Sequence, residues 1–176
     1  MDNELSLIKK VGEGDKEAFG ALYGIYCKKI YALELRLTGN PERAEEACQE
    51  TFIKVWEKIG QFKGDSSFYT WITRVAINCA FSQGRKRLKR KKAITAFVEA
   101  FVKCYDKMDG RKEELIDLEI SIQKLPDRSR TALILHSICG YKHYEVAEIM
   151  GISEGASKAH IFRAKRLLKK ELGYDA

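Results

Sequence analysis

The stretch that decides the fold of the C-terminal part is Tyr144-Glu145-Val146-Ala147-Glu148-Ile149-Met150-Gly151-Ile152-Ser153, followed directly by residues 154–172. Its apolar residues fall on one side of a short helix predicted over 144–150. Gly151 favours a tight turn, and Ser153 can cap a second helix that is long and basic. A short helix, a glycine turn and a cationic second helix together form a helix-turn-helix signature.

The second helix of this motif is expected to have two different faces. Ile161, Ala164 and Leu168 are spaced three and four residues apart and are expected to face inward. The N-terminal half of the other face would enter a major groove, where lysine and arginine can reach guanine edges. The side chains left outside there are Ser157, Lys158, His160 and Arg163, and those placed for phosphates are Lys165, Arg166, Lys169 and Lys170. The alternative is a solvated basic helix that packs only on its own domain.

Charge is segregated along the 176-residue chain, which carries a net charge of +7. Residues 85–92 include seven basic side chains in eight positions, and residues 158–170 contain no acid. Residues 42–57 carry five glutamates instead. Concentrated positive charge favours a polyanionic partner, whereas the acidic segment would suit a cationic surface. The sequence therefore predicts at least two kinds of partner surface.

The rest of the chain shows helical periodicity and no strand signal. Asp15 is expected to cap the first helix, and a second apolar series ends at Gly39. Asn40-Pro41 predicts the start of another helix, and residues 61–67 a break before a helix from Phe68. The pattern weakens over 91–112, where we expect a linker, and helices resume from 113 and from 126.

Catalysis, metal or cofactor binding and membrane insertion are not expected. The three histidines lie apart, and no nucleophile–base pair or phosphate loop accompanies them. The five cysteines lack metal-ligand spacing and are expected to be reduced, buried thiols. No apolar run approaches the roughly 18 residues of a membrane span, and the acidic N-terminus lacks a signal-peptide core. These features predict a cytoplasmic protein.

Several C-terminal motifs resemble region 4 of the sigma-70 family of bacterial RNA polymerase sigma factors. They are Leu125-Pro126-Asp127-Arg128, Gly140-Tyr141, residues 146–153 and Gly155-Ala156-Ser157-Lys158. Region 4 reads the minus-35 promoter element in that family. The resemblance implies a duplex-contacting set on the second helix, namely Ser157, Lys158, Ala159, His160, Phe162, Arg163, Lys165 and Arg166. Lys142 departs from the family pattern, since serine often caps the first motif helix, and so does His160, where arginine is common.

The N-terminal half resembles region 2 of the same family. The matching motifs are residues 14–19, Ala44-Glu45-Glu46, Gln49-Glu50-Thr51-Phe52 and Trp56, with Arg43 standing where an acid is frequent. In that family the acidic helix docks on the clamp coiled coil of the polymerase. The resemblance implies a polymerase-binding set of Glu46, Gln49, Glu50 and Phe52. Glu46 and Glu50 are four residues apart and share a helix face, although the glutamates alone fit a merely solvated surface equally well.

The segment from Phe62 to Phe68 resembles the loop with which the family melts DNA and captures an unpaired minus-10 base. A glycine-bearing polar loop permits close backbone approach, and aromatic faces can replace lost base stacking, worth roughly 1–3 kcal/mol per base. Helical spacing with Ile72 and Val75 also fits Trp71 as a core residue that shapes the site. The implied single-stranded minus-10 set is Phe62, Lys63, Gly64, Asp65, Ser66, Ser67, Phe68, Trp71, Arg74, Asn78 and Arg85.

The expected fold class is all-α, with two small helical domains joined by a flexible linker. A region 2 bundle is expected over 1–90, the linker over 91–112 and a region 4 helix-turn-helix over 113–176. The resemblance implies a non-enzymatic initiation factor of the small extracytoplasmic-function type, which binds polymerase core and directs it to minus-10 and minus-35 elements. It also makes an anti-sigma factor a possible partner. The alternative is a stand-alone helix-turn-helix regulator, which would leave the acidic helix, the 62–68 loop and the 85–92 block unexplained.

Overall fold

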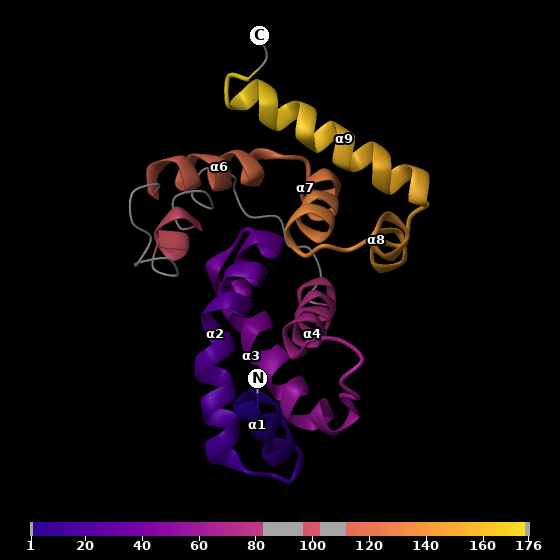
Figure 1. Ribbon diagram of the computed structural model, residues 1–176. Helices are drawn as coiled ribbons and strands as arrows, with labels where there is room; N and C mark the ends of the chain where they lie inside the picture. Colours follow the sequence, from indigo (N-terminus) through magenta and orange to yellow (C-terminus); the bar gives the residue numbers. More distant parts are fainter. Residues whose placement is uncertain (1, 83–96, 103–111, 175–176) are drawn as a thin grey trace. The chain divides into compact units, whose positions relative to one another are not determined.

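The computed structural model describes residues 2–82, 97–102 and 112–174, and these residues form helices and loops with no strand among them (Figure 1). The chain divides into two compact units, Met1–Cys104 and Tyr105–Ala176. The predicted all-α fold of two small helical domains is therefore confirmed. The division falls within the predicted linker, most of which lies outside the described residues together with the basic block 85–92.

The first unit is built from α1 (Asp2–Gly12), α2 (Lys16–Thr38), α3 (Pro41–Lys58), the 3-10 turn η1 (Ile59–Gln61) and α4 (Phe68–Ser82). Helices α2, α3 and α4 pack against one another, while α1 packs on α2 and η1 (Figure 1). The prediction that the first helix starts near Asp15 is wrong, because α1 precedes it. Ile8 and Val11, three residues apart, bury one side of α1, and a Glu4 carboxylate accepts a hydrogen bond from the Tyr26 hydroxyl.

Local chemistry sets the ends of α2 and α3 as the sequence predicts. Asp15 Oδ1 accepts hydrogen bonds from two N–H groups of the first turn of α2, at 2.9 and 3.0 Å. Gly39 follows α2 with a φ of 64°, a left-handed conformation that glycine adopts without steric cost. Asn40 Oδ1 then accepts from the Arg43 N–H at 2.8 Å and caps α3. Removing such a cap typically costs about 1 kcal/mol.

The core between α2, α3 and α4 contains one fully buried carboxyl group. Glu34 has an exposed fraction of 0%, and apolar residues of these helices such as Leu35 and Ile72 are also 0% exposed. Thr51 Oγ1 donates a hydrogen bond to Glu34 Oε1 at 3.2 Å, and Oε2 has no hydrogen-bond partner among the described residues. Loss of hydration, partly opposed by the Thr51 hydrogen bond, raises the pKa of Glu34 to about 8. The folded protein therefore holds this carboxyl mainly in its neutral form at neutral pH.

A short helical segment, residues 97–102, belongs to the first unit. The side chains of Phe97 and Phe101 are 1% and 4% exposed, and their stacked rings have centroids 5.8 Å apart. The Arg36 guanidinium carbon lies 5.3 Å from the Phe101 ring centroid, so the segment contacts α2. This part of the predicted linker is a packed helix.

The second unit contains α6 (Lys112–Lys124), α7 (Asp127–Leu133), the π-helical turn η2 (Ile134–Ile138), α8 (His143–Met150) and α9 (Glu154–Glu171). Figure 1 shows α9 lying across α7 and α8. The core of the second unit includes Ile122, Leu125, Leu133 and Ala164. Ser153 Oγ accepts from the Ala156 N–H at 3.1 Å and caps α9. The predicted helix-turn-helix is therefore present, formed by α8 and α9.

Candidate functional site

The outer face of α9 carries a row of exposed side chains. Ile161 and Ala164, which are 4% and 0% exposed, hold the opposite face on the core. Phe162 is 70% exposed, an unusual position for a large apolar side chain. The exposed residues of the predicted minus-35 set are Lys158, Ala159, Phe162, Arg163, Lys165 and Arg166. This division into two faces has the geometry of a helix that can enter a major groove.

Ser157 is the exception within that set. Its side chain is 0% exposed, and its hydroxyl lies 3.3 Å from Nδ1 of His143 on α8. The expectation that Ser157 faces outward is therefore wrong. Ser157 precedes Ile161 by four residues and Ala164 by seven, so helical periodicity places it on the inner face.

Two other residues of the set have partners within the second unit. The Lys158 ammonium lies 2.7 Å from a Glu154 carboxylate oxygen, and both side chains are exposed. Hydrogen bonding to Lys158 lowers the pKa of Glu154. An exposed pair of this kind contributes about 0–1 kcal/mol, so a phosphate or a guanine can replace Glu154 as the partner of Lys158. His160 is half-buried, with Nδ1 3.4 Å from the Ser129 hydroxyl of α7.

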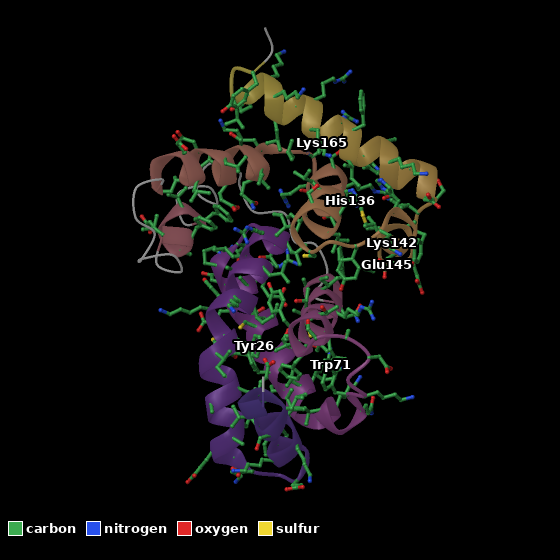
Figure 2. All side chains as sticks on the ribbon, viewed as in Figure 1. Tyr26, Trp71, His136, Lys142, Glu145 and Lys165 are labelled. Carbon is green, nitrogen blue, oxygen red and sulfur yellow. The ribbon has the colours of Figure 1, made fainter. Side chains whose placement is uncertain are left out.

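Helix α8 sets the position of the turn that precedes α9. Lys142 occupies its N-cap position, where a lysine has no acceptor to offer the first N–H groups. Instead, Glu145 Oε2 accepts from the Lys142 backbone N–H at 2.8 Å, which supplies one half of a capping box (Figure 2). Gly151, with a φ of 62°, lets the Ile152 N–H reach the Ala147 carbonyl at 3.0 Å. The first of these bonds fixes the start of α8, and the second closes the turn between the two motif helices.

The exposed face of α3 is acidic with one apolar residue within it. Glu46 and Gln49 are exposed, and Glu50 is half-exposed. Phe52 is 4% exposed, so its ring supports the helix from inside, contrary to the expectation of direct partner contact. Ile53 is 59% exposed and was missed by the sequence reasoning. It follows Gln49 by four residues and Glu46 by seven, which places it on the same helix face.

Aromatic rings gather where the loop after η1 enters α4. The ring centroid of Phe62 lies 5.5 Å from that of Phe68 and 5.8 Å from that of Trp71. The centroids of Phe68 and Trp71 lie 5.6 Å apart, so the three rings contact one another. Phe68 is 3% exposed and supports the cluster from within, which corrects its assignment to the contacting set. Phe62 and Trp71 are half-buried and keep part of their ring surface open to solvent.

Polar groups lie beside this aromatic cluster. Gly64, with a φ of 80°, turns the loop, and Ser67 Oγ accepts from the Thr70 N–H at 3.1 Å to cap α4. Arg74 and Asn78 follow Thr70 at intervals of four residues and share its helix face. The exposed members of the predicted minus-10 set are Lys63, Gly64, Asp65, Ser67, Arg74 and Asn78, with Ser66 half-buried. Arg85 lies outside the described residues.

The described parts of the chain hold no group of three or more His, Cys, Asp or Glu side chains arranged for a metal ion. Among the helices of those same parts, none combines the length and the apolarity that crossing a membrane requires. Among the described residues, Cys27, Cys48, Cys79 and Cys139 form no disulfide, and Cys104 lies outside this part of the chain.

Comparisons with known proteins identify the family. The family model for sigma-70 region 2 matches residues 22–90, and the model for sigma-70 region 4 matches residues 117–168. The RNA polymerase sigma-H factor of Pseudomonas aeruginosa is 32% identical over 98% of this chain and 95% of that protein. The ECF RNA polymerase sigma factor SigW of Bacillus subtilis is 33% identical over 94% of each. The chain belongs to the sigma-70 family.

Solved structures agree with this sigma factor in fold. CnrH, in complex with the cytosolic domain of CnrY, aligns with a TM-score of 0.60 over 99% of both chains at 24% identity. The sigma factor RpoE of Bartonella quintana, in complex with the anti-sigma factor NepR, aligns with a TM-score of 0.61 at 23% identity. That match covers 90% of this chain and 98% of the other.

Family membership establishes the general activity of the protein. It is a sigma factor of the extracytoplasmic-function type, a transcription initiation factor that binds RNA polymerase core and directs it to promoters. A stand-alone helix-turn-helix regulator does not account for the region 2 match over residues 22–90.

Proposed function

We propose that α9 reads the minus-35 element with its exposed face. The observation that carries this proposal is that Lys158 and Arg163 are exposed along its N-terminal and middle turns while Ile161 and Ala164 anchor the opposite face. Lys158 and Arg163 are suited to guanine edges, and the exposed Phe162 ring to a thymine methyl group. Ala159 and His160 flank these contacts, while Lys165 and Arg166 hold phosphates.

The phosphate role of Lys165 and Arg166 predicts a particular salt dependence. Each phosphate contact releases counterions, so replacing either residue with Ala should lower the slope of log affinity against log salt by about one. The loss of affinity should be similar on promoters with matched and mismatched minus-35 elements. Holoenzyme binding to both DNAs across a salt series measures this, with Lys9→Ala, an exposed lysine of α1, as control. A loss confined to the matched promoter would instead assign these residues to base recognition.

We propose that the surface of the 62–68 loop and the first turns of α4 binds the unpaired minus-10 strand. Phe62 and Trp71 offer partly open rings for stacking, and this contributes roughly 1–3 kcal/mol per base. Lys63 and Arg74 are exposed cations beside them, suited to the backbone of the strand. Arg85 and the rest of the basic block would extend this phosphate contact, as the sequence predicts.

We propose that the acidic face of α3 docks on the polymerase, and that Ile53 is its apolar centre. Glu46, Gln49 and Glu50 border Ile53 along this face. Charged groups at a rim chiefly guide association, whereas an apolar group at the centre is desolvated and dominates affinity. Phe52 contributes from inside by packing on Tyr23 of α2, with ring centroids 4.7 Å apart.

Replacing Ile53 with Asp should weaken core binding about thirtyfold, because a truncated or charged hot spot loses about 2 kcal/mol. Titration of fluorescent sigma factor with purified core polymerase measures the dissociation constant directly. Ile25→Asp is the matched control, since Ile25 is an isoleucine of the same unit with 46% exposure on α2. Equal affinities of the Ile53 variant and the wild type would remove Ile53 from the docking surface.

We further propose that the protein has no catalytic activity of its own and acts in the cytoplasm, where polymerase and promoter DNA meet. The assignment of polymerase binding and minus-10 recognition to residues 1–90, and of minus-35 recognition to 113–176, follows the two family matches. An anti-sigma factor is proposed as a regulatory partner on the ground of the family alone. A pull-down from the native host that recovers no such protein would count against it.

A further inference from the structure

Two histidines that lie apart in the sequence meet next to α9. The rings of His136, in η2, and His143, in the first turn of α8, stack with centroids 4.3 Å apart and planes 19° apart. Figure 2 shows His136 close to where α7, α8 and α9 converge. Both α8 and η2 belong to the packed core of the second unit, so the stack joins elements that position α9.

Hydrogen bonds connect this stack to α9. His136 Nδ1 lies 2.8 Å from the Tyr141 backbone oxygen, which can only accept, so Nδ1 carries the proton and donates it. His143 Nδ1 lies 3.3 Å from the Ser157 hydroxyl. Ser157 is 0% exposed and immediately precedes Lys158 in the first turns of α9. Contacts therefore connect Tyr141, through both histidine rings, to Ser157. Ser157 lies beside Lys158, for which we propose a base contact.

The electrostatic surroundings disfavour a charged stack. Loss of hydration, followed by the charges of His136 and Lys158, lowers the pKa of His143, and Lys165 acts in the same direction. Glu154 alone among the facing charged groups opposes this shift. These groups come from η2 and α9, the elements packed against α8. A single imidazolium can rest on a neutral ring, but two imidazolium rings at stacking distance repel each other.

We propose that the stacked pair of His136 and His143 positions α9 through Ser157, and that charging both rings releases α9 from its DNA-reading position. The inference rests on the proposed reading of the minus-35 element by α9. It makes His136 and His143 positioning residues that need not touch DNA. Added positive charge strengthens attraction to any DNA, so the expected consequence is lost discrimination and not lost binding.

The test measures discrimination by the wild-type holoenzyme and by a holoenzyme with His136→Phe. Phenylalanine keeps a flat ring on His143 and leaves the Ser157 contact in place, but it cannot be charged. The ratio of affinities for promoters with matched and scrambled minus-35 elements should fall at least about threefold between about pH 8 and about pH 5 in the wild type, because charging both rings requires a pH below the lowered pKa of His143. In the variant the ratio should stay level, because the two rings can no longer both be charged. Each protein is compared with itself at the two pH values, so a difference in overall affinity does not affect the result.

Tyr144→Phe is the matched control, since Tyr144 follows His143 on α8, is 56% exposed and lies outside the stack. Whatever its affinity, it should keep the pH response of the wild type. An equal pH response in the wild type and His136→Phe would overturn the inference while leaving minus-35 reading intact. Absence of any discrimination by the wild type at about pH 8 would instead overturn the proposed function.

A second measurement does not depend on the variant folding. In the wild-type chain, the backbone amide resonance of Lys158 should titrate together with the ring resonances of His143. A Lys158 amide that stays unchanged while the His143 ring becomes charged would contradict the coupling through Ser157.

Discussion

Replacing both Lys158 and Arg163 with Ala is expected to reduce transcription from minus-35-dependent promoters about thirtyfold or more, with polymerase binding unchanged. Each side chain is exposed on the outer face of α9. A good base contact contributes about 1–3 kcal/mol, so losing two corresponds to roughly 2–6 kcal/mol. The ion pair of Lys158 with Glu154 is exposed and weak, so its loss in the variant adds little to the expected effect.

The double variant Lys169→Ala with Lys170→Ala is the matched control, because it removes the same charge from the last turn of the same helix. We expect a modest loss that is similar on all promoters, since these lysines lie away from the groove-reading half. Run-off transcription and gel filtration with core polymerase measure the two activities separately. If Lys158→Ala with Arg163→Ala also abolished co-elution with polymerase, α9 would not be a dedicated minus-35 reader.

Replacing Glu34 with Gln is expected to change how the stability of the first unit depends on pH. The pKa of this buried carboxyl is raised to about 8 in the folded protein, mainly by loss of hydration. Between the ordinary pKa of glutamate and about pH 8, the folded state therefore keeps a proton on Glu34 that the unfolded state has released. The proton on Glu34 stabilises the folded state. This stabilisation is complete below the unfolded pKa and is lost as pH rises toward about 8. Glutamine does not titrate. The free energy of unfolding of the variant, relative to that of the wild type, should therefore rise by about 3 kcal/mol between about pH 5 and about pH 8.

Chemical unfolding of the full chain at several pH values measures this difference. Trp56 and Trp71, the only tryptophans, both lie in the first unit, so their fluorescence reports its unfolding. Glu46→Gln removes an exposed carboxyl of α3 and should follow the wild type across the pH range. If Glu34→Gln also ran parallel to the wild type, Glu34 would be ionised in the folded protein.

Helix ends were predictable from the sequence because their chemistry is local. Asp15, Gly39, Asn40 and Ser153 each satisfy backbone groups within a few residues of themselves, so a short window of sequence contains the whole cause. Helix α1 was missed for the opposite reason. Its short apolar side gains stability from burial against α2 and η1, which no local signal announces.

The errors in the candidate sites share one cause, which is that helical periodicity was not applied to every residue of the two helices. Ser157 falls in register with Ile161 and Ala164, and the spacing already indicated the buried face. Ile53 likewise falls in register with Gln49 on the exposed face of α3. The stack of His136 on His143 could not be predicted, because it depends on how η2, α8 and α9 pack together.

In vitro transcription with purified bacterial core polymerase, with and without this protein, across a library of promoter sequences tests the central claim most directly. The account predicts that the protein directs initiation from a subset of templates that share two spaced elements, and that neither core nor protein alone does so. Core polymerase that stays silent in its presence, while the protein alone protects duplex DNA, would contradict the account and favour a stand-alone regulator.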